Sequence, residues 1–322
     1  VAAGGPVSLA AVVSASGGFT PSGGSVQFKF RKASESASSA ANLGALVPLA
    51  ESPVGSGTWK AAIPSLSTGA DGDAIHEAAN YVITAEFQGT SQVGISASGD
   101  TPLTVTKAAP ALTVTLPGSG TVTVGDTGNI RAVVSGSPSN RLDDSPARLK
   151  FFDGATELAS LTVSNLGSGV LGADFSVSSL NAGAYSITVE YVANAYFTGT
   201  TSSAQTLTVN KYSPSITVNT ITAVQVGNDL TISSTLQCGG GACSGVRDHA
   251  GGSVSFYKDS VSATNLLATD TSISAGGTAS ITVSTGDALL LPAAGTAYSI
   301  VAAFNGDATN GNLNAVTSSS SS

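Results

Sequence analysis

Few side chains in this sequence of 322 residues are suited to proton transfer or nucleophilic attack. It contains only two histidines, His76 in "DGDAIHEAAN" and His249 in "VRDHAGG", and both stretches are typical of turns. A hydrolytic triad requires a Ser, a His and an acid within hydrogen-bond reach of one another. Each histidine has an acid nearby in sequence, as most loop histidines do, and nothing else indicates such a site. We therefore predict that the chain is not an enzyme.

The two cysteines, Cys238 and Cys243, occur in the motif "CGGGAC". "GACSG" resembles a nucleophile elbow centred on Cys243, but that elbow needs a strand leading into a helix. Here a Gly-rich loop and a further predicted strand flank the motif. A flexible loop of this size can bring two cysteines within disulfide distance. The prediction is a structural disulfide, and the alternative is two free thiols in a loop.

Acidic residues occur in pairs at Asp71 and Asp73 and at Asp143 and Asp144, and Asp307 lies in "FNGDATNGN". Calcium binds several oxygen ligands, and acidic loops can supply them, but none of these stretches has EF-hand spacing. Asp also favours turns because its side chain bonds to the local backbone. We predict no cofactor, with calcium as the alternative.

The composition excludes two classes of partner. The net charge is −8 and the 12 Lys and Arg residues do not cluster, so the chain lacks the basic stripe that nucleic-acid binding requires. The longest apolar runs, such as 288–294, are too short to span a membrane. There is no Met, and "VAAGG" at Val1 suits the mature side of a signal-peptide cleavage site. We expect a secreted or surface-exposed protein.

Two sets of three similar segments indicate internal repeats of strands. Alternation of apolar and polar residues, typical of half-buried strands, occurs in "GGSVQFKF", "SPARLKFF" and "GGSVSFYK". A later strand recurs as "NYVITAEF", "AYSITVEY" and "AYSIVAAF", with tyrosines at Tyr81, Tyr185 and Tyr298. These tyrosines are roughly 105 to 115 residues apart, which is the size of one small domain. Each tyrosine follows a turn and opens a strand, so we predict a tyrosine corner in each repeat.

The repeats predict three domains, at residues 1–107, 108–211 and 212–322. Each repeat contains about seven short strands separated by turn signals, and no stretch has a convincing helical period. The predicted fold is all-β, with three tandem Ig-like Greek-key β-sandwiches arranged end to end. Trp59, the only Trp, is expected in the core of the first.

The motifs of these repeats are similar to those of bacterial Ig-like repeat domains from large surface proteins. The similarity is carried by "GGSVSFYKD", "GGTASITVS" and "AYSIVAAFNGDA" in the third repeat, with matching segments in the second and more divergent ones in the first. The resemblance implies tandem domains in adhesin stalks, surface layers or decorations of bacteria or phages. It implies no catalytic residues.

Two short segments join the repeats: "LTVTKAAPALTV" and "LTVNKYSPSITV". Each has a Lys and then a Pro between two strand-like runs, at Lys107 and Pro110 and at Lys211 and Pro214. Because proline fixes its own φ, these segments predict stiff interdomain hinges with few residues to spare.

The first repeat is expected to lack its first strand, and the third to lack its closing strand, because "LNAVTSSSSSS" is too polar for a core strand. A missing edge strand exposes apolar side chains and unpaired backbone groups. A cut from a longer array, irregular caps, or strand donation between subunits would each account for this pattern.

The predicted function is that of a structural protein, as a subunit or segment of a surface filament, layer or stalk. Its expected partners are copies of itself or neighbouring surface proteins. The alternatives are an adhesin that binds a host or glycan ligand through loops, with 33–54 as the candidate segment, and the accessory region of a larger secreted enzyme.

Overall fold

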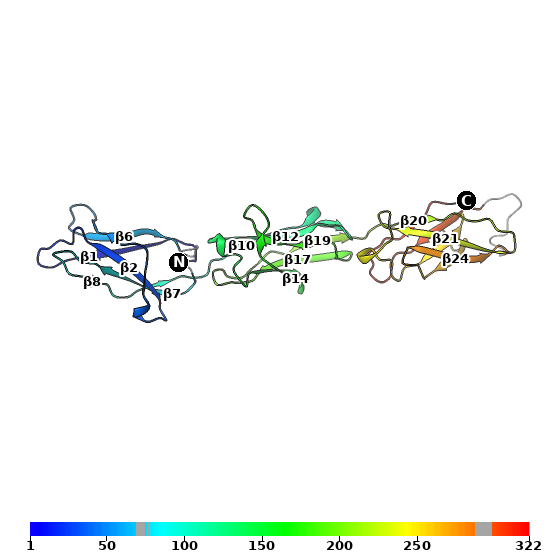
Figure 1. Cartoon of the computed structure of the whole chain (residues 1–322). Helices are drawn as coiled ribbons and strands as arrows, with labels where there is room; N and C mark the ends of the chain where they lie inside the picture. The colour runs from blue at the N-terminus through cyan, green and yellow to red at the C-terminus, as the bar shows by residue number, and fades with distance from the viewer. Residues whose placement is uncertain (69–74, 76, 287–297, 322) are drawn as a thin grey trace. The chain divides into compact units, whose positions relative to one another are not determined.

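The computed structural model describes residues 1–68, 75, 77–286 and 298–321 (Figure 1). Its described part is built of β-strands, with four 3-10 turns: η1 (Ala37–Ser39), η2 (Pro117–Gly120), η3 (Ser139–Arg141) and η4 (Gly245–Arg247). The strands form six sheets, and the strands of each pair of sheets are contiguous in sequence. The chain is thus three tandem Ig-like β-sandwiches, as the sequence predicted.

The first sandwich pairs a sheet of order β1-β6-β5 with one of order β3-β2-β7-β8, in which β4 also pairs with β2 and β9 with β7. The strands are β1 (Val7–Val13), β2 (Ser25–Lys32), β3 (Ala41–Asn42), β4 (Val47–Pro48), β5 (Ala50–Glu51), β6 (Trp59–Leu66), β7 (Asn80–Phe87), β8 (Ser96–Ala97) and β9 (Thr101–Thr104).

The second sandwich pairs β10-β12-β16-β15 with β11-β19-β17-β13-β14, and β18 pairs with β17. The strands are β10 (Ala111–Thr115), β11 (Thr121–Thr123), β12 (Asn129–Ser135), β13 (Arg148–Asp153), β14 (Thr156–Thr162), β15 (Ser164–Asn165), β16 (Leu171–Ser176), β17 (Gly183–Tyr191), β18 (Thr200–Thr201) and β19 (Gln205–Asn210).

The third sandwich pairs β20-β21-β24 with β23-β22-β25-β26. The strands are β20 (Ser215–Val218), β21 (Asp229–Gln237), β22 (Val254–Lys258), β23 (Leu266–Asp270), β24 (Thr278–Ser284), β25 (Ile300–Phe304) and β26 (Val316–Thr317). In all three sandwiches consecutive strands cross between the sheets, for example β12 to β13 and β16 to β17, which is the Greek-key connection.

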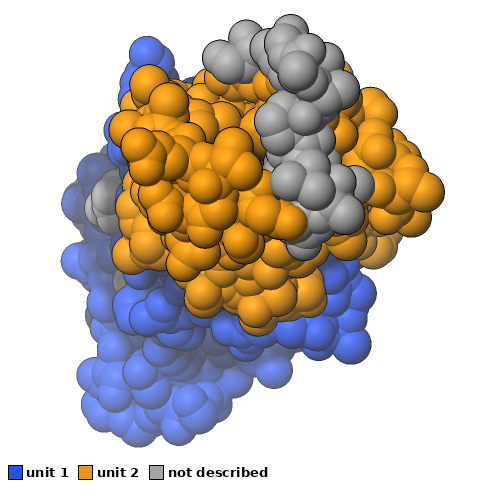
Figure 2. All heavy atoms as spheres, turned by 90° about the vertical axis from the view of Figure 1, so that its right-hand side faces the viewer, with its two compact units in different colours: residues 1–114, 132–173, 188–203 blue, residues 115–131, 174–187, 204–322 orange. Residues whose placement is uncertain are grey.

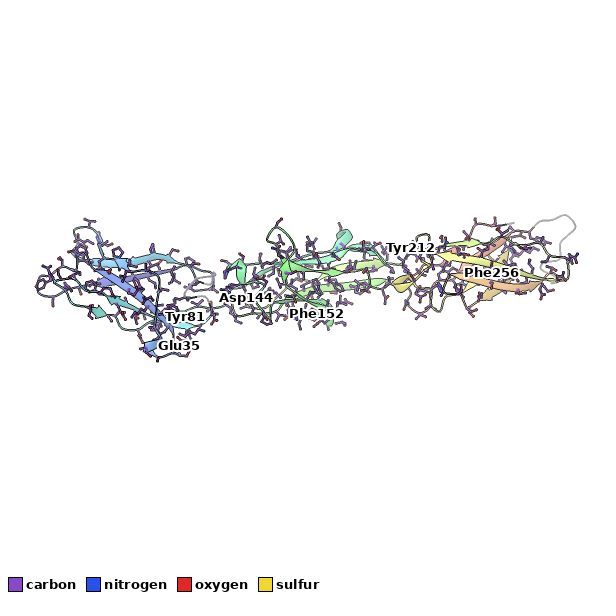
Figure 3. All side chains as sticks on the ribbon, in the orientation of Figure 1. Glu35, Tyr81, Asp144, Phe152, Tyr212 and Phe256 are labelled. Carbon is purple, nitrogen blue, oxygen red and sulfur yellow. A yellow bond between two sulfur atoms is a disulfide. The ribbon has the colours of Figure 1, made fainter. Side chains whose placement is uncertain are left out.

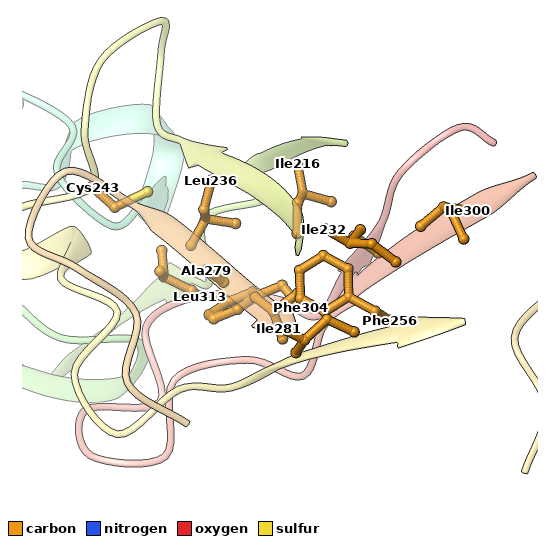
Figure 4. Packing of buried hydrophobic residues seen from close by; sticks show 12 residues of the cluster. Ile216, Ile232, Leu236, Cys243, Phe256, Ala279, Ile281, Ile300, Phe304 and Leu313 are labelled. Carbon is orange, nitrogen blue, oxygen red and sulfur yellow. The ribbon is translucent and has the colours of Figure 1, made fainter. Parts of the chain in front are cut away.

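The hydrophobic cores are formed by strands in which buried and exposed side chains alternate. In β12, Ile130, Ala132 and Val134 point inward and are buried, and the residues between them are more exposed. Such alternation puts every second side chain on the core face. The third core packs Phe256 of β22 and Phe304 of β25 against Ile216, Ile232 and Ile281 from the facing sheet (Figure 4).

The chain divides into two compact units whose bounds differ from those of the three repeats. One unit comprises Val1–Val114, Ala132–Ala173 and Thr188–Ser203, and the other comprises Thr115–Arg131, Asp174–Ile187 and Ala204–Ser322 (Figure 2). The division passes through the second sandwich. Each unit therefore contains one of the two segments that join the repeats, 103–114 and 207–218, which are called the first and second joints below. The boundaries 1–107, 108–211 and 212–322 stay predictions.

Both ends of the chain pair with the sandwich that contains them. Val1–Ala3 lies where β11 lies in the second sandwich: Ala2 pairs in parallel with Thr106, as Val122 pairs with Val209. The C-terminal tail was expected to leave the third sandwich without a closing strand. It pairs with β25 through β26, at the place where β18 pairs with β17, and Ser321 bridges Ile300 as Gln205 at the start of β19 pairs with Ile187. The lack of a closing strand equivalent to the rest of β19 therefore stays a prediction. Backbone hydrogen bonds do not require apolar side chains, which explains how a Ser-rich segment can pair here.

Candidate functional site

The two cysteines are joined in a disulfide, with Cα atoms 4.9 Å apart. Cys238 follows β21 and its amide donates a hydrogen bond to the carbonyl of Gly241, which forms a tight turn. Cys243 is buried in the third core (Figure 4). Its sulfur is therefore occupied by a structural bond and is not a free nucleophile.

Tyr81 and Tyr185 make the backward hydrogen bond that is typical of a tyrosine corner. The Tyr81 hydroxyl, in the first sandwich (labelled in Figure 3), donates to the carbonyl of Glu77 at 3.0 Å. The Tyr185 hydroxyl donates to the carbonyl of Asn181 at 2.8 Å. Burial raises the pKa of Tyr81. At Tyr298 the structure places the Lys258 ammonium 3.8 Å from the ring centroid, a cation–π contact.

A fourth tyrosine, which the sequence reasoning missed, anchors the second sandwich. Tyr191 is fully buried at the end of β17, and its hydroxyl donates to the carbonyl of Leu142 at 2.9 Å. Burial raises the pKa of Tyr191 to about 12, and the charges of Asp144 and Asp143 act in the same direction. The signal was available: Tyr191 occupies the position of Phe87 and Phe304, and a hydroxyl there needs a partner.

The candidate metal and catalytic groups serve other contacts or lie outside the described residues. Asp307 is buried, and its carboxylate accepts the amides of Asn312 and Leu313 at 3.0 and 2.7 Å, so it shapes its own loop. Asp144 pairs with Arg141 at 3.3 Å. His249 is buried, whereas His76, Asp71 and Asp73 fall outside the described residues. Within the described ranges no three His, Cys, Asp or Glu side chains gather in a way that could hold a metal.

The first joint is hydrogen-bonded to the second sandwich through its backbone. Ala108 forms a parallel bridge with Phe197 of the second sandwich: its amide donates to the carbonyl of Tyr196 at 2.8 Å, and its carbonyl accepts the amide of Thr198 at 2.9 Å. The Lys107 ammonium donates to the carbonyl of Asn194. The Asn194 side chain organises this loop by accepting the amides of Tyr196 and Phe197.

The second joint repeats this arrangement. Tyr212 bridges in parallel to Leu313, donating to the carbonyl of Asn312 and accepting from the amide of Asn314, both at 2.8 Å. The fully buried Asn312 reaches back to the second repeat: its side chain accepts the amide of Ala182 at 2.7 Å and donates to the side-chain oxygen of Asn181 at 2.9 Å.

Arg247 links both sides of the second joint. It stacks 4.1 Å over the ring of Tyr212 and donates to the carbonyl of Val124 in the second repeat at 2.8 Å. Figure 3 labels Tyr212 at this position. A planar guanidinium can stack on an aromatic ring and donate in its own plane at once, which a lysine cannot do.

Equivalent glycines complete the two joints. Gly4 and Gly125 follow the segments paired with Thr106 and Asn210, and their φ angles are +82° and +80°. A Cβ on Gly4 would lie 2.6 Å from the backbone of Ser137, and one on Gly125 would lie 2.6 Å from Arg247. Close approach and a positive φ both require glycine here. Sequence reasoning did not single out these glycines, Asn194 or Asn312.

The predicted hinge residues all lie in these joints. Pro110 and Pro214 are buried, whereas Lys107 and Lys211 are exposed. Their role as hinges stays a prediction.

The first sandwich differs from the others along β1. Within the described residues only β6 pairs with β1, whereas β12 lies between β10 and β16, and β21 lies between β20 and β24. A groove of about 420 Å³ runs along β1 and is lined by Leu9, Ala11, Phe28, Ile83 and Leu103, among others. An adjoining groove of about 190 Å³ extends it past Val13 and Phe87.

Comparison with known proteins finds no matching family model and no matching curated protein. Solved structures of tandem domains are similar to the chain. A tetra-tandem repeat from the extending region of a large adhesion protein has 16% identity and a TM-score of 0.37, over 94% of this chain and 66% of that one. A stretch of titin domains has 14% identity and a TM-score of 0.33, over 100% and 94%. Sidekick-1 immunoglobulin domains have 12% and 0.22, over 98% and 55%.

The chain therefore covers just under two thirds of the adhesion-protein structure. At these TM-scores the similarities carry no inference about function. No described helix is long and apolar enough to cross a membrane.

Proposed function

We propose that the chain is a non-enzymatic structural protein of an extracellular surface, a subunit or segment of a filament, layer or stalk built from Ig-like domains. The observation that carries the proposal is the bonding of the two joints. A flexible linker leaves its backbone to water, but Ala108 and Tyr212 each donate and accept a backbone hydrogen bond with the following sandwich. Such joints limit the angles between domains, which suits a protein that bears load or sets a spacing.

The disulfide in the third sandwich supports an extracellular location, because disulfides persist in oxidising compartments. The partners we propose are copies of the chain or neighbouring surface proteins, joined by strand complementation, since within the described residues the apolar strand β1 pairs only with β6.

The experiment is analytical ultracentrifugation over a range of concentrations, combined with electron microscopy of the concentrated protein. Assemblies with a regular repeat are expected. Monomers at every concentration, with no ordered particles, would reject assembly by copies of this chain alone.

An adhesin role is the second candidate, and one segment favours it. Residues 33–54 contain exposed apolar side chains, with Leu46 52% and Val54 91% exposed. The same segment buries Leu43 and Leu49 in the first core, so it is anchored to the sandwich. Binding to a glycan array that is lost when Leu46 and Val54 are replaced by Ser would support this role, and no binding would exclude glycans as its ligand.

A further inference from the structure

The loop between β21 and β22 connects the third sandwich to the second repeat at the second joint. From this loop Arg247 donates to the carbonyl of Val124 at 2.8 Å and stacks 4.1 Å over the ring of Tyr212. The carbonyl of Val246 accepts the side-chain amide of Asn312 at 2.8 Å, and the same side chain bonds to the second repeat. The bonding of the second joint therefore depends on the conformation of this loop.

The disulfide fixes the loop just before Arg247. Cys238 is the first residue after β21, and Cys243 is buried in the third core (Figure 4). The turn η4 begins shortly after it, at Gly245, and ends at Arg247. The Cys238 sulfur also lies 4.0 Å from the carbonyl oxygen of Arg247. Both ends of the segment that carries Arg247 thus lie close to the disulfide.

The stretch between the two cysteines is rich in glycine and passes beside the joint. Its sequence is "GGGA", and Gly239 and Gly240 have φ angles of +66° and +87°. Glycine adopts such angles readily, but it also has the most conformational freedom to lose on folding. A Cβ on Gly239 would lie 3.7 Å from the Tyr212 hydroxyl oxygen. A covalent bond across this stretch therefore restricts a flexible segment that lies next to Tyr212.

The first joint has a similar plan without a disulfide. There Arg141 ends the turn η3, as Arg247 ends η4, and it stacks 4.9 Å over the ring of Tyr196. This arginine pairs with Asp144 at 3.3 Å, and its carbonyl accepts the side-chain amide of Asn194 at 2.7 Å. The sequence has no cysteine besides the two in the third repeat. One chain therefore contains a joint beside a disulfide and a matched joint without one.

We propose that the disulfide between Cys238 and Cys243 makes the second joint redox-sensitive. In the oxidised chain the bond places η4 so that Arg247 reaches Val124, and reduction releases Arg247 and the backbone pairing of Tyr212. The third core stays folded, because a bond that closes so short a loop contributes little to global stability and the core is built mainly from strands outside the loop. The inference goes beyond the proposed function and does not depend on it, since it concerns bonds within a single chain.

The two sulfurs differ in their access to a reductant. Cys238 is half-buried, whereas Cys243 is almost completely buried. A thiolate of a dithiol reductant therefore attacks the Cys238 sulfur: a mixed disulfide forms there, the bond to Cys243 breaks, and Cys243 leaves as a thiolate that takes up a proton. The second thiol of the reductant, after losing its proton, displaces Cys238, which leaves as a thiolate and is protonated. Two electrons pass to the protein and the reductant ends as a disulfide.

Hydrogen exchange of the full chain with and without dithiothreitol, followed by mass spectrometry of peptic peptides, tests this coupling. The amides of Tyr212 and Asn314 report on the second joint, and those of Ala108 and Thr198 make the equivalent bonds in the first. On reduction, exchange at Tyr212 and Asn314 should become about tenfold faster or more, because the lost Arg247 bond is charge-assisted. Exchange at the first joint and in β22, β24 and β25 should be unchanged.

Two variants separate this coupling from other effects of the reductant. Cys238→Ser combined with Cys243→Ala should exchange rapidly at Tyr212 and Asn314 in both conditions, since it has no bond to reduce. Arg247→Lys keeps the disulfide and the charge but loses the stacked, in-plane donation. It should speed exchange in the oxidised chain, and reduction should then add little, because two changes that act through one contact are not additive.

Unchanged exchange at Tyr212 and Asn314 on reduction would overturn the inference. Equal acceleration in β22, β24 and β25 would also overturn it, because the bond would then hold the third core and not the joint. Equal acceleration at Ala108 and Thr198, or full additivity of reduction and Arg247→Lys, would overturn it as well. If the double cysteine variant does not fold, the native chain and Arg247→Lys, each with and without dithiothreitol, are sufficient for these comparisons.

Discussion

At the scale of single residues, polar side chains in this protein act mainly by ordering its own loops. Asn194, Asp307 and Asn312 are almost completely buried, and each bonds to backbone groups that would otherwise be unpaired. An unpaired buried backbone group costs about 1 to 3 kcal/mol. These side chains therefore hold the loops that receive the joints in a single conformation.

Tyr191 provides a test at this scale. Tyr191→Phe leaves the carbonyl of Leu142 without its donor and should reduce the stability of the second sandwich by about 1 to 2 kcal/mol. Faster hydrogen exchange of β17 and β13, measured by mass spectrometry, would show it. Unchanged exchange would mean that water replaces the hydroxyl.

The same tyrosine predicts a pH dependence. Its folded pKa of about 12 is above the usual value near 10. Its contribution is fully present below about pH 10 and is lost as the pH rises toward 12, since the unfolded chain ionises first. In Tyr191→Phe this part of the alkaline loss of stability should be absent, which thermal unfolding at pH 9 to 11.5 can measure.

At the scale of elements, the joints depend on glycines that combine a positive φ with close contact. Gly4→Ala should destabilise more than Gly55→Ala. Both glycines have a φ of +82°, but no atom lies within 4 Å of a Cβ at Gly55. Strain of about 1 to 2 kcal/mol is common to both, and only Gly4→Ala collides with the backbone of Ser137.

Gly125→Ala should have an intermediate effect, because its Cβ meets the end of the flexible Arg247 side chain. Calorimetric unfolding of the full chain compares the three variants. An equal loss in Gly4→Ala and Gly55→Ala would show that contact at the first joint does not contribute to stability.

The sequence was sufficient to predict the strands and their order, since alternation in segments such as "AYSITVEY" depends on local residue types. It also predicted the bond between the two cysteines, which are close in sequence. It did not predict Asn312, because that side chain acts through Asn181 and Ala182, which are far away in sequence. The pairing of β26 with β25 was not predicted, because the sequence reasoning considered only the polarity of the tail, whereas backbone groups make the pairing.

At the scale of the whole molecule, the same joint is built twice from different residues. The bridge partner is Phe197 in the first joint and Leu313 in the second. Gly4 and Gly125 each lie against the sandwich that follows their own. Reuse of one geometry with different side chains indicates that backbone pairing defines the joint and that side chains adjust it. Larger arrays could therefore extend by the same unit.

The paired joints also have a consequence for cleavage by proteases. Lys107 and Lys211 present trypsin sites on exposed side chains between sandwiches, where linkers are usually cut. The residues on both sides of each lysine are hydrogen-bonded: Thr106 to Val1 and Ala3, Ala108 to Tyr196 and Thr198, Asn210 to Val124, and Tyr212 to Asn312 and Asn314. A protease needs an extended, unpaired segment, so the native chain should resist trypsin at both lysines.

Asn312→Ala should speed cleavage after Lys211 and leave cleavage after Lys107 unchanged, which peptide mass mapping would show. Rapid cleavage of the native chain at both lysines would mean that the joints open freely. If the joints resist cleavage, the three sandwiches would stay connected in the presence of secreted proteases. The hydrogen bonds of the joints would then be sufficient, without an added covalent cross-link between the sandwiches.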